Sequence, residues 1–120
     1  MPSKRDITRD LFAAYQAKDR ARLERLLTDD FRFTSPYDDA IDKATYFERC
    51  WPASIDGRIA SNTIEKLTEA GDDVFVQYKC VTNDGKEFRN VECHTFAGDK
   101  VCEVNVYFGA TYQDGKFVRQ

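Results

Sequence analysis

Apolar residues recur at helical spacing through the first part of the chain. Over residues 4–17 they fall on one face of a predicted helix, at Ile7, Leu11, Phe12 and Tyr15. Ser3, followed three residues later by Asp6, is typical of a capping box, so we expect this helix to begin directly after Ser3. Asp19 is placed to cap a second, short helix that ends before the polar segment 28–30. The apolar face of this second helix carries Leu23, Leu26 and Leu27.

The next segment combines a short strand with a third helix. Residues 31–35 alternate between apolar and polar, which predicts a strand that stops at Pro36. Residues 37–39, Tyr-Asp-Asp, then have loop chemistry. Asp42 is placed to cap a third helix that is closed by Pro52. Its apolar side chains are Tyr46, Phe47, Cys50 and Trp51.

From Arg58 onward the pattern is that of strands. Turn signals at 70–73, 83–85 and 98–99 separate predicted strands over 58–69, 73–82, 86–97 and 101–112, and the polar tail 113–120 is expected to be loose. Long antiparallel strands with helices on one side curl. We therefore predict an α+β fold, a cone-shaped, curled antiparallel sheet (half-barrel) wrapped over three N-terminal helices, in a single domain of residues 1–120.

The predicted strand 86–97 has polar residues where an apolar face is expected. Side chains alternate between the two faces of a strand, so one face carries Phe88, Asn90, Glu92, His94 and Phe96. If this face looks into the protein, the chain encloses polar groups among aromatic rings, as natural proteins mostly do where binding or chemistry happens. If it looks outward, Glu92 is an ordinary surface carboxylate that pairs with Arg89 or Lys86.

Composition limits the classes of function. The chain has 120 residues, 42% of them hydrophobic, which fits one globular domain. No apolar run approaches the roughly 20 residues that span a bilayer, and the charged N-terminus has no secretory signal, so we expect a cytoplasmic protein without membrane contact. The net charge is −3 and the basic residues are interleaved with acids, which argues against nucleic acid as a partner.

Metal and cofactor motifs are not evident in the sequence. The four cysteines, at positions 50, 80, 93 and 102, form no C-x-x-C pair, which argues against a zinc site and indicates reduced, buried side chains. The sequence has no Gly-rich phosphate loop, so hydride and phosphate chemistry are not indicated. We expect neither a metal nor a cofactor.

Three segments, taken with the order of the elements, are similar to a known superfamily. They are AAYQAKD in the first helix, LLTDDF before the first strand, and FAGDKVCEVNVYF in the last hairpin. The chain thus resembles the nuclear transport factor 2-like superfamily, and within it the SnoaL-like and ketosteroid isomerase-like branch. The resemblance covers residues 4–112 and implies a pocket between the concave sheet face and the helices. Because this fold hosts isomerases, cyclases, hydrolases, dehydratases and binding modules, it leaves the activity open.

The resemblance also implies roles for individual residues. Tyr15 falls where the isomerases place an oxyanion-stabilising tyrosine, and Glu92 falls where they place a protonated carboxylic acid. Two catalytic aspartates are missing, because Ser35 stands at the general-base position of the isomerases and Val106 stands where the SnoaL-like cyclases keep theirs. Cys50 stands in place of a third pocket tyrosine. Both catalytic programs are therefore incomplete in this chain.

We predict a site in which Glu92 donates or accepts a proton, Tyr15 donates a hydroxyl, and His94, the only histidine, is an auxiliary base. The predicted ligand-binding residues are Phe12, Phe33, Ser35, Trp51, Asn90, Val104, Val106 and Phe108. Asp38 or Asp39 could supply the missing base, although such a pair also fits a turn. No residue is chosen from 73–82, because both faces of that strand are partly apolar.

Two functions remain open. The first is a cofactor-independent acid–base enzyme of isomerase, cyclase or hydrolase type, acting on a hydrophobic polycyclic, terpenoid or ketide-like molecule. The second is a non-catalytic module that binds a small hydrophobic ligand or dimerises. Glu103, Asn105 and Tyr107 lie on the opposite face of the last strand, where the resemblance implies a homodimer interface and where a solvated surface is the alternative.

Overall fold

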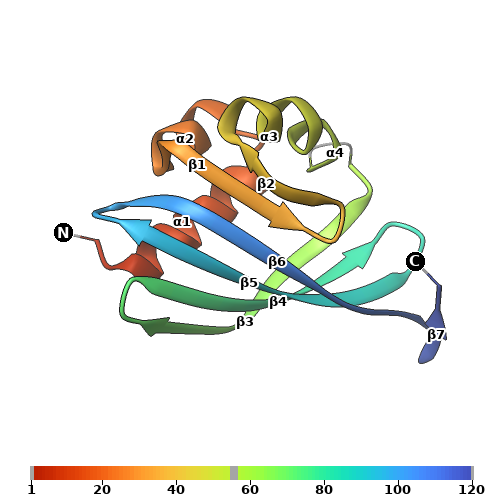
Figure 1. The fold of residues 1–120 in the computed structure, drawn as a ribbon. Helices are drawn as coiled ribbons and strands as arrows, with labels where there is room; N and C mark the ends of the chain where they lie inside the picture. The colour runs from red at the N-terminus through yellow and green to blue at the C-terminus, as the bar shows by residue number, and fades with distance from the viewer. Residues whose placement is uncertain (1, 55–56, 120) are drawn as a thin grey trace.

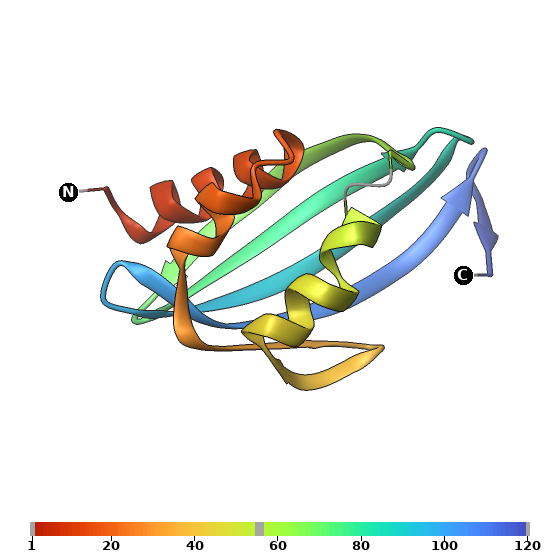
Figure 2. The ribbon, with the colours of Figure 1, turned by 90° about the horizontal axis from the view of Figure 1, so that it is seen from above.

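The helices and the sheet form two layers, with the helices lying over the concave face of a curled sheet (Figures 1 and 2). The computed structural model describes residues 2–54 and 57–119. The predicted α+β architecture is confirmed, because a curled and unclosed sheet wraps the helical layer in one compact unit.

Three helices begin at the caps that the sequence indicates. In α1 (Lys4–Gln16), Ser3 and Asp6 form the reciprocal capping box. The side chain of Asp19 accepts a hydrogen bond from the Arg22 N–H at the start of α2 (Arg20–Leu26). The side chain of Asp42 does the same for the Thr45 N–H at the start of α3 (Lys43–Arg49).

The third helix ends earlier than predicted. Pro52 has no N–H to donate to the Glu48 carbonyl, so the helical ladder cannot run unbroken through this point. The chain forms α3 and then a separate short helix, α4 (Trp51–Ser54), with Cys50 as the C-cap of α3. Pro52 therefore lies in the first turn of α4, a position that tolerates proline, rather than closing α3.

Within residues 2–54 and 57–119, seven strands form the sheet. They are β1 (Leu27–Ser35), β2 (Asp38–Asp42), β3 (Ile59–Ala70), β4 (Asp73–Thr82), β5 (Lys86–Ala97), β6 (Lys100–Gln113) and β7 (Lys116–Val118). The order is β2-β1-β6-β5-β4-β3, and β7 pairs with β6. The four long strands lie close to their predicted bounds.

Two segments predicted as irregular are strands, and one pairing is parallel. Residues 38–39 were expected in a loop, but the chain reverses tightly at Pro36, where the Ser35 hydroxyl accepts the Tyr37 N–H, and β2 then pairs with β1. In the tail, β7 turns back onto β6. The pairing of β1 with β6 is parallel, so the sheet is not wholly antiparallel as predicted. The second helix does end before residues 28–30, at Leu26, but Leu27 and this segment already belong to β1, so the first strand begins earlier than predicted.

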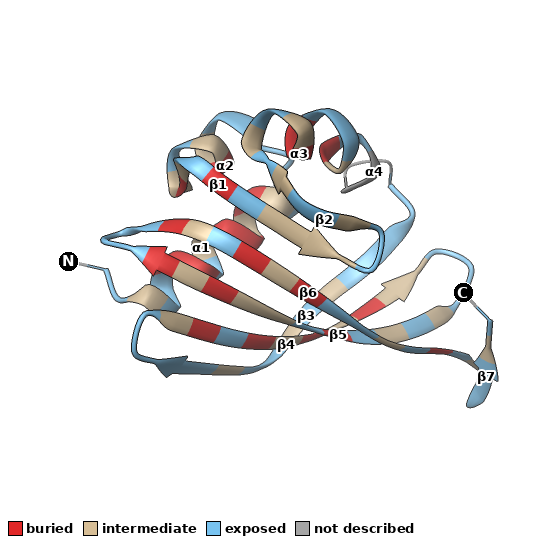
Figure 3. Cartoon of the chain, viewed as in Figure 1, coloured by how far each residue is buried: buried red, intermediate tan, exposed pale blue. Residues whose placement is uncertain are grey.

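The core lies between the helices and one face of the sheet, and it settles which residues of β4 point inward. Val74, Val76, Tyr78 and Cys80 are buried, whereas Phe75 is exposed on the opposite face (Figure 3). The alternation of β5 is as predicted, with Asn90, His94 and Phe96 buried on the inner face. Of the four cysteines only Cys80 is buried, so the expectation of burial was wrong for the other three.

A close backbone approach marks the middle of β6. The β5–β6 register shifts between Phe88 and Asn90. A Cβ placed on Gly109 would overlap the carbonyl oxygen of Arg89, so only glycine fits there without movement. The irregularity follows directly after Phe108 and so lies at the end of the inward-facing row of β6.

No helix among the described residues has the length and apolarity to cross a membrane.

Candidate functional site

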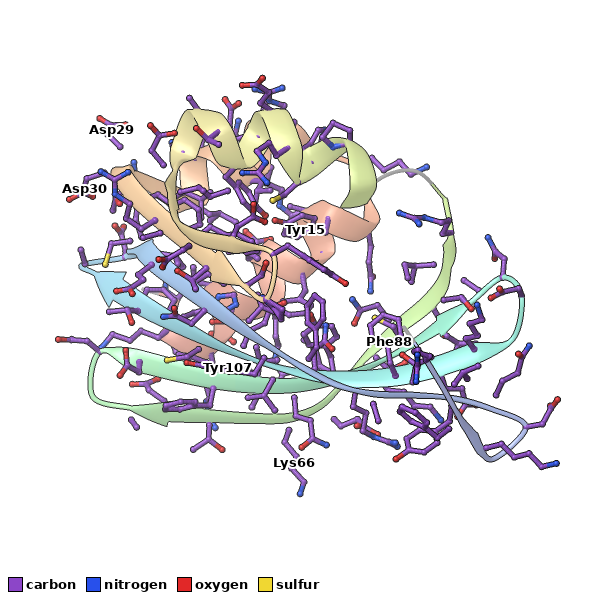
Figure 4. The ribbon with its side chains drawn as sticks, turned by 45° about the vertical axis from the view of Figure 1, so that its right-hand side comes forward. Tyr15, Asp29, Asp30, Lys66, Phe88 and Tyr107 are labelled. Atoms are coloured by element: carbon purple, nitrogen blue, oxygen red, sulfur yellow. The ribbon has the colours of Figure 1, made fainter. Side chains whose placement is uncertain are left out.

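A cavity of about 500 Å³ lies between the concave face of the sheet and the helices. Its walls come from α1, α2, α3, β1, the β1–β2 turn and the inner faces of β3 to β6. Figure 4 shows Tyr15 between the helices and the sheet, whereas Lys66 points away from the other face. The predicted site residues that line this cavity are Phe12, Tyr15, Phe33, Ser35, Asn90, Glu92, His94, Val104, Val106 and Phe108.

Trp51 is the predicted site residue that does not line the cavity. It is buried, and its ring lies against Tyr15 with centroids 5.7 Å apart and against Phe47 at 6.2 Å. The split between α3 and α4 sets its direction, since it begins a new helix rather than continuing the old one. Trp51 therefore packs against the Tyr15 ring without lining the cavity itself.

Four polar side chains form a continuous hydrogen-bond chain along the cavity wall. Asn90 Nδ2 donates to the Tyr78 hydroxyl at 3.0 Å, and that hydroxyl donates to Glu92 Oε2 at 2.5 Å. The other carboxylate oxygen, Oε1, lies 2.8 Å from His94 Nε2. The alternative partners of Glu92 are used elsewhere, because Arg89 bonds Glu65 and Lys86 pairs with an acidic residue of its own turn. Glu92 is thus an inward carboxylate, with 15% of its side chain exposed.

The ionised form of Glu92 sets the direction of each hydrogen bond among these four side chains. An ionised carboxylate can only accept, so both Tyr78 and His94 must donate to Glu92. The Tyr78 oxygen is then left to accept from Asn90, which orients the Asn90 amide with its Oδ1 away from the chain. With Glu92 ionised and His94 carrying one ring proton, the 2.8 Å contact places that proton on Nε2 and leaves a bare lone pair on Nδ1.

At each end of this row of hydrogen-bonded side chains, a buried polar atom has no partner among the described residues. His94 Nδ1 and Asn90 Oδ1 have none, and both residues line the cavity. Asn62 Oδ1, on β3, is a third such atom in the cavity wall. Unpaired buried groups cost about 1–3 kcal/mol each, and folded proteins rarely leave them without water or a ligand. These atoms therefore mark where a bound molecule or solvent completes the wall.

Aromatic rings hold the polar chain in place. The Phe12 ring, from α1, stacks on His94 with centroids 6.0 Å apart and meets the edge of Tyr78 at 5.1 Å. Across the cavity, burial and then the negative charge of Glu92 raise the pKa of Tyr15 well above its ordinary value. The same two causes raise the pKa of Tyr78 strongly and that of Cys80 to about 11. The two phenols are therefore neutral hydrogen-bonding groups.

A second polar cluster lies between β1, β2 and α3. Asp38 has 8% of its side chain exposed, and its Oδ1 lies 2.9 Å from Arg49 Nη2. That oxygen lacks a well-aligned hydrogen bond, but the ion pair compensates its charge. The Ser35 hydroxyl lies 3.4 Å from Asp38 Oδ2, and Cys50 Sγ lies 3.7 Å from the same oxygen. Ser35 also accepts the Tyr37 N–H, so its hydroxyl is committed to this turn.

The cavity opens to solvent at one end. Tyr37 and Phe108 are 73% and 39% exposed, and their rings meet edge to face with centroids 5.6 Å apart. Ile59, from β3, is the third exposed apolar residue of the described lining. The deep end lies at His94, which has no exposed surface.

Sequence reasoning missed Tyr78 and Asn62. Tyr78 joins Asn90 to Glu92, yet the face of its strand could not be assigned beforehand. The available signal was a tyrosine within a row of aliphatic residues, because a buried phenol needs a hydrogen-bond partner. The polar residue Asp38, one of two alternatives for a base, does lie on the cavity wall, whereas Asp39 does not line it. Among the described residues no group of three or more His, Cys, Asp or Glu side chains could hold a metal ion.

The curled sheet over helices, with a cavity between the layers, defines a cone-shaped α+β protein of the nuclear transport factor 2-like type. Residues 8–104 match the SnoaL-like domain family, and the chain belongs to that family. The predicted resemblance is thereby confirmed. No curated protein matches the chain.

Solved structures with the same fold differ in the activities suggested for them. An NTF2-like protein of unknown function from Cytophaga hutchinsonii superposes with a TM-score of 0.73 at 17% identity, covering 90% of this chain and 91% of that chain. A "putative ketosteroid isomerase" from Kribbella flavida gives 0.75 at 18% identity, covering 92% and 80%. A "putative hydroxylase" from Streptomyces galilaeus gives 0.73 at 12%, covering 88% and 78%. At these identities the likeness concerns the fold alone.

Proposed function

We propose that this protein binds a small, mainly apolar molecule in its cavity and carries out acid–base chemistry on it without a cofactor. The observation that carries the proposal is the buried chain Asn90–Tyr78–Glu92–His94, which ends in unpaired atoms on the cavity wall. Burying such groups costs stability, and proteins retain that cost mostly at functional sites. The cavity volume lies within the range of sites for small molecules.

In this proposal His94 Nδ1 is the atom that takes the proton from the ligand. Nε2 already donates to Glu92, so a proton arriving at Nδ1 creates an imidazolium whose charge the adjoining carboxylate stabilises. Glu92 is then the orienting and charge-stabilising partner, with Tyr78 fixing its second oxygen. Return of the proton to another ligand atom completes an isomerisation or a ring closure.

Tyr15 supports the same chemistry from the opposite wall. Its raised pKa keeps the phenol protonated, so it can donate to an oxygen that gains negative charge. The likeness to the Kribbella flavida protein is compatible with isomerase-type chemistry, although that likeness concerns the fold alone. The phenyl and aliphatic side chains of Phe12, Phe33 and Val104 supply the apolar walls.

The test begins by identifying the ligand, through native mass spectrometry of the purified protein, and then measures turnover and affinity. Glu92→Gln should reduce turnover by about 10²-fold or more while the ligand still binds, because the imidazolium loses its counter-charge. Glu87→Gln is the matched control, since it makes the same change on the same strand but on the exposed face. Unchanged turnover and unchanged affinity in Glu92→Gln would contradict the proposal.

A non-catalytic binding module is the second candidate. The observation favouring it is that residue 35, where isomerases of this branch are expected to have an aspartate, is a serine held in a turn, while the nearby Asp38 carboxylate is paired with Arg49. In that case Glu92→Gln should weaken binding, and no member of a set of ligand analogues should be converted on prolonged incubation. Conversion of any analogue by the unaltered protein, at a rate that Glu92→Gln reduces, excludes the binding module.

A further inference from the structure

The polar wall of the cavity is rich in hydrogen-bond acceptors. The chain of hydrogen bonds directs the donating groups of Tyr78, His94 and Asn90 towards Glu92 or towards one another. What remains for a ligand is the lone pair of His94 Nδ1 and that of Asn90 Oδ1, beside the second N–H of the Asn90 amide. Both residues are more than nine-tenths buried and lie on either side of Glu92 along β5.

The charge of the cavity also disfavours an anionic ligand. Arg49 is the only lysine or arginine among the described lining residues, and it is already paired with Asp38. Within the described ranges, no lysine or arginine pairs with the Glu92 carboxylate, and His94 is its ring-nitrogen partner. Its negative charge reaches across the cavity, because it contributes to the raised pKa of Tyr15 on α1. A ligand anion would therefore meet a negative potential and two lone pairs.

The geometry points to a ligand whose polar groups are hydrogen-bond donors, hydroxyl or ammonium, carried on an apolar body, rather than a carboxylate, a phosphate or a bare ketone. This inference rests on the proposed function, because it concerns the ligand of the same site. Hydroxyl and amine groups donate directly to His94 Nδ1 and Asn90 Oδ1. A ligand that only accepts leaves both of these atoms unpaired and adds its own acceptor as a third unpaired group. Tyr15 can donate or accept, so it is compatible with either class.

A set of ligands with one apolar cage tests the polarity of the wall. We choose 1-adamantanol, 1-adamantanamine, 2-adamantanone and adamantane-1-carboxylate, measured by calorimetry at pH 7.5. The alcohol and the amine should bind about tenfold or more tightly than the ketone and the carboxylate, which corresponds to one buried hydrogen bond. If the alcohol and the amine have nearly equal dissociation constants, the selectivity comes from hydrogen bonding. If the amine binds more tightly, part of the selectivity comes from the Glu92 charge.

The single histidine gives a second, direct measurement. Because the chain has one histidine, long-range ¹H–¹⁵N NMR reports His94 without ambiguity. The expected spectrum has the proton on Nε2 and a bare Nδ1 whose resonance shifts when 1-adamantanol is added. Protons on both nitrogens at pH 7.5, or a proton on Nδ1 alone, overturn the inference.

Glu92→Gln should reverse the preference of the cavity for ligands that donate hydrogen bonds over ligands that only accept them. The glutamine amide can accept from Tyr78 only by turning its NH₂ towards His94, which then keeps its proton on Nδ1. The variant should therefore lose selectivity for the alcohol and gain affinity for 2-adamantanone, and the His94 spectrum should change to the other tautomer. Glu87→Gln should leave both readouts unchanged.

These outcomes separate the inference from the proposed catalysis. Selective binding of donors without any turnover supports the inference and contradicts the catalytic proposal. Turnover of a ligand that has only acceptor groups contradicts the inference and supports catalysis. If the ketone or the carboxylate binds as tightly as the alcohol, or if none of the four binds at millimolar concentration, the inference is wrong.

Discussion

The hydroxyl of Tyr78 joins two halves of the buried polar chain, so Tyr78→Phe is the most informative single change. The substitution removes one oxygen and keeps the ring that packs against Phe12. It breaks the 2.5 Å hydrogen bond to Glu92 and the 3.0 Å hydrogen bond from Asn90. Little repacking is expected, so the effect reports the polar chain itself.

The magnitude follows from these two contacts. A hydrogen bond to a charged acceptor contributes about 1.5–3 kcal/mol, and a buried donor left unpaired, here Asn90 Nδ2, costs about 1–3 kcal/mol. Water entering from the adjoining cavity recovers part of this sum. We expect Tyr78→Phe to lower the free energy of unfolding by about 2–4 kcal/mol, which for a domain of this size lowers Tm by roughly 10 °C.

Urea denaturation followed by circular dichroism measures this change, with the slope m checked for each variant. Tyr112→Phe is the control, because Tyr112 is 45% exposed near the end of β6 and should change stability by less than about 0.5 kcal/mol. A loss below about 0.5 kcal/mol in Tyr78→Phe, with an unchanged m, would refute the reasoning.

A double-mutant cycle extends the same test. If Tyr78 and Glu92 act through their shared hydrogen bond, the effects of Tyr78→Phe and Glu92→Gln should not add, and their coupling energy should exceed about 1 kcal/mol. Additive effects would show that the two side chains are independent despite their short contact.

Three further predictions concern other parts of the molecule. Gly109→Ala should lower the free energy of unfolding by about 2 kcal/mol or more in the same urea assay, because its Cβ overlaps the Arg89 carbonyl oxygen; an unchanged midpoint contradicts this. Burial and Asp38 raise the pKa of Cys50 to about 11, so at pH 8 only about one Cys50 thiol in a thousand is ionised. The rate of Cys50 alkylation, measured by mass spectrometry, should therefore increase with pH up to pH 10. Asp38→Asn should lower that pKa and speed the reaction at pH 8, and an equal rate contradicts the assignment. The proposed homodimer through the convex face should dissociate in Tyr107→Glu, as measured by sedimentation velocity, and a monomer in the unaltered protein refutes it.

The inward face of β5 was predictable because the period of a strand fixes which residues share a face. Asn90, Glu92 and His94 had to lie together, and three helices over a curled sheet made the inner side the better prediction. Tyr78 could not be assigned, because Val74 and Val76 on one face compete with Phe75 and Val81 on the other and a single bulge would exchange them.

The mouth of the cavity was harder to predict than its floor. The polar residues Asp38 and Asp39 have the composition of a loop, yet pairing with β1 outweighs their low strand propensity and turns the segment into β2. The direction of Trp51 depended on where Pro52 interrupts the helix, which a periodic pattern continuing to Trp51 did not reveal. Strand pairing decided the first case, and the interruption of the helix at Pro52 decided the second.

The polar chain comes entirely from one hairpin. Tyr78 lies directly across from Asn90 in the β4–β5 register, and Glu92 and His94 follow along the same strand. The apolar walls come from α1, α3, β1 and β6. The polar chain and most of the apolar walls are therefore encoded in separate segments, so substitutions in the helices at positions other than Phe12 and Tyr15 can change which molecules fit while the hairpin stays intact.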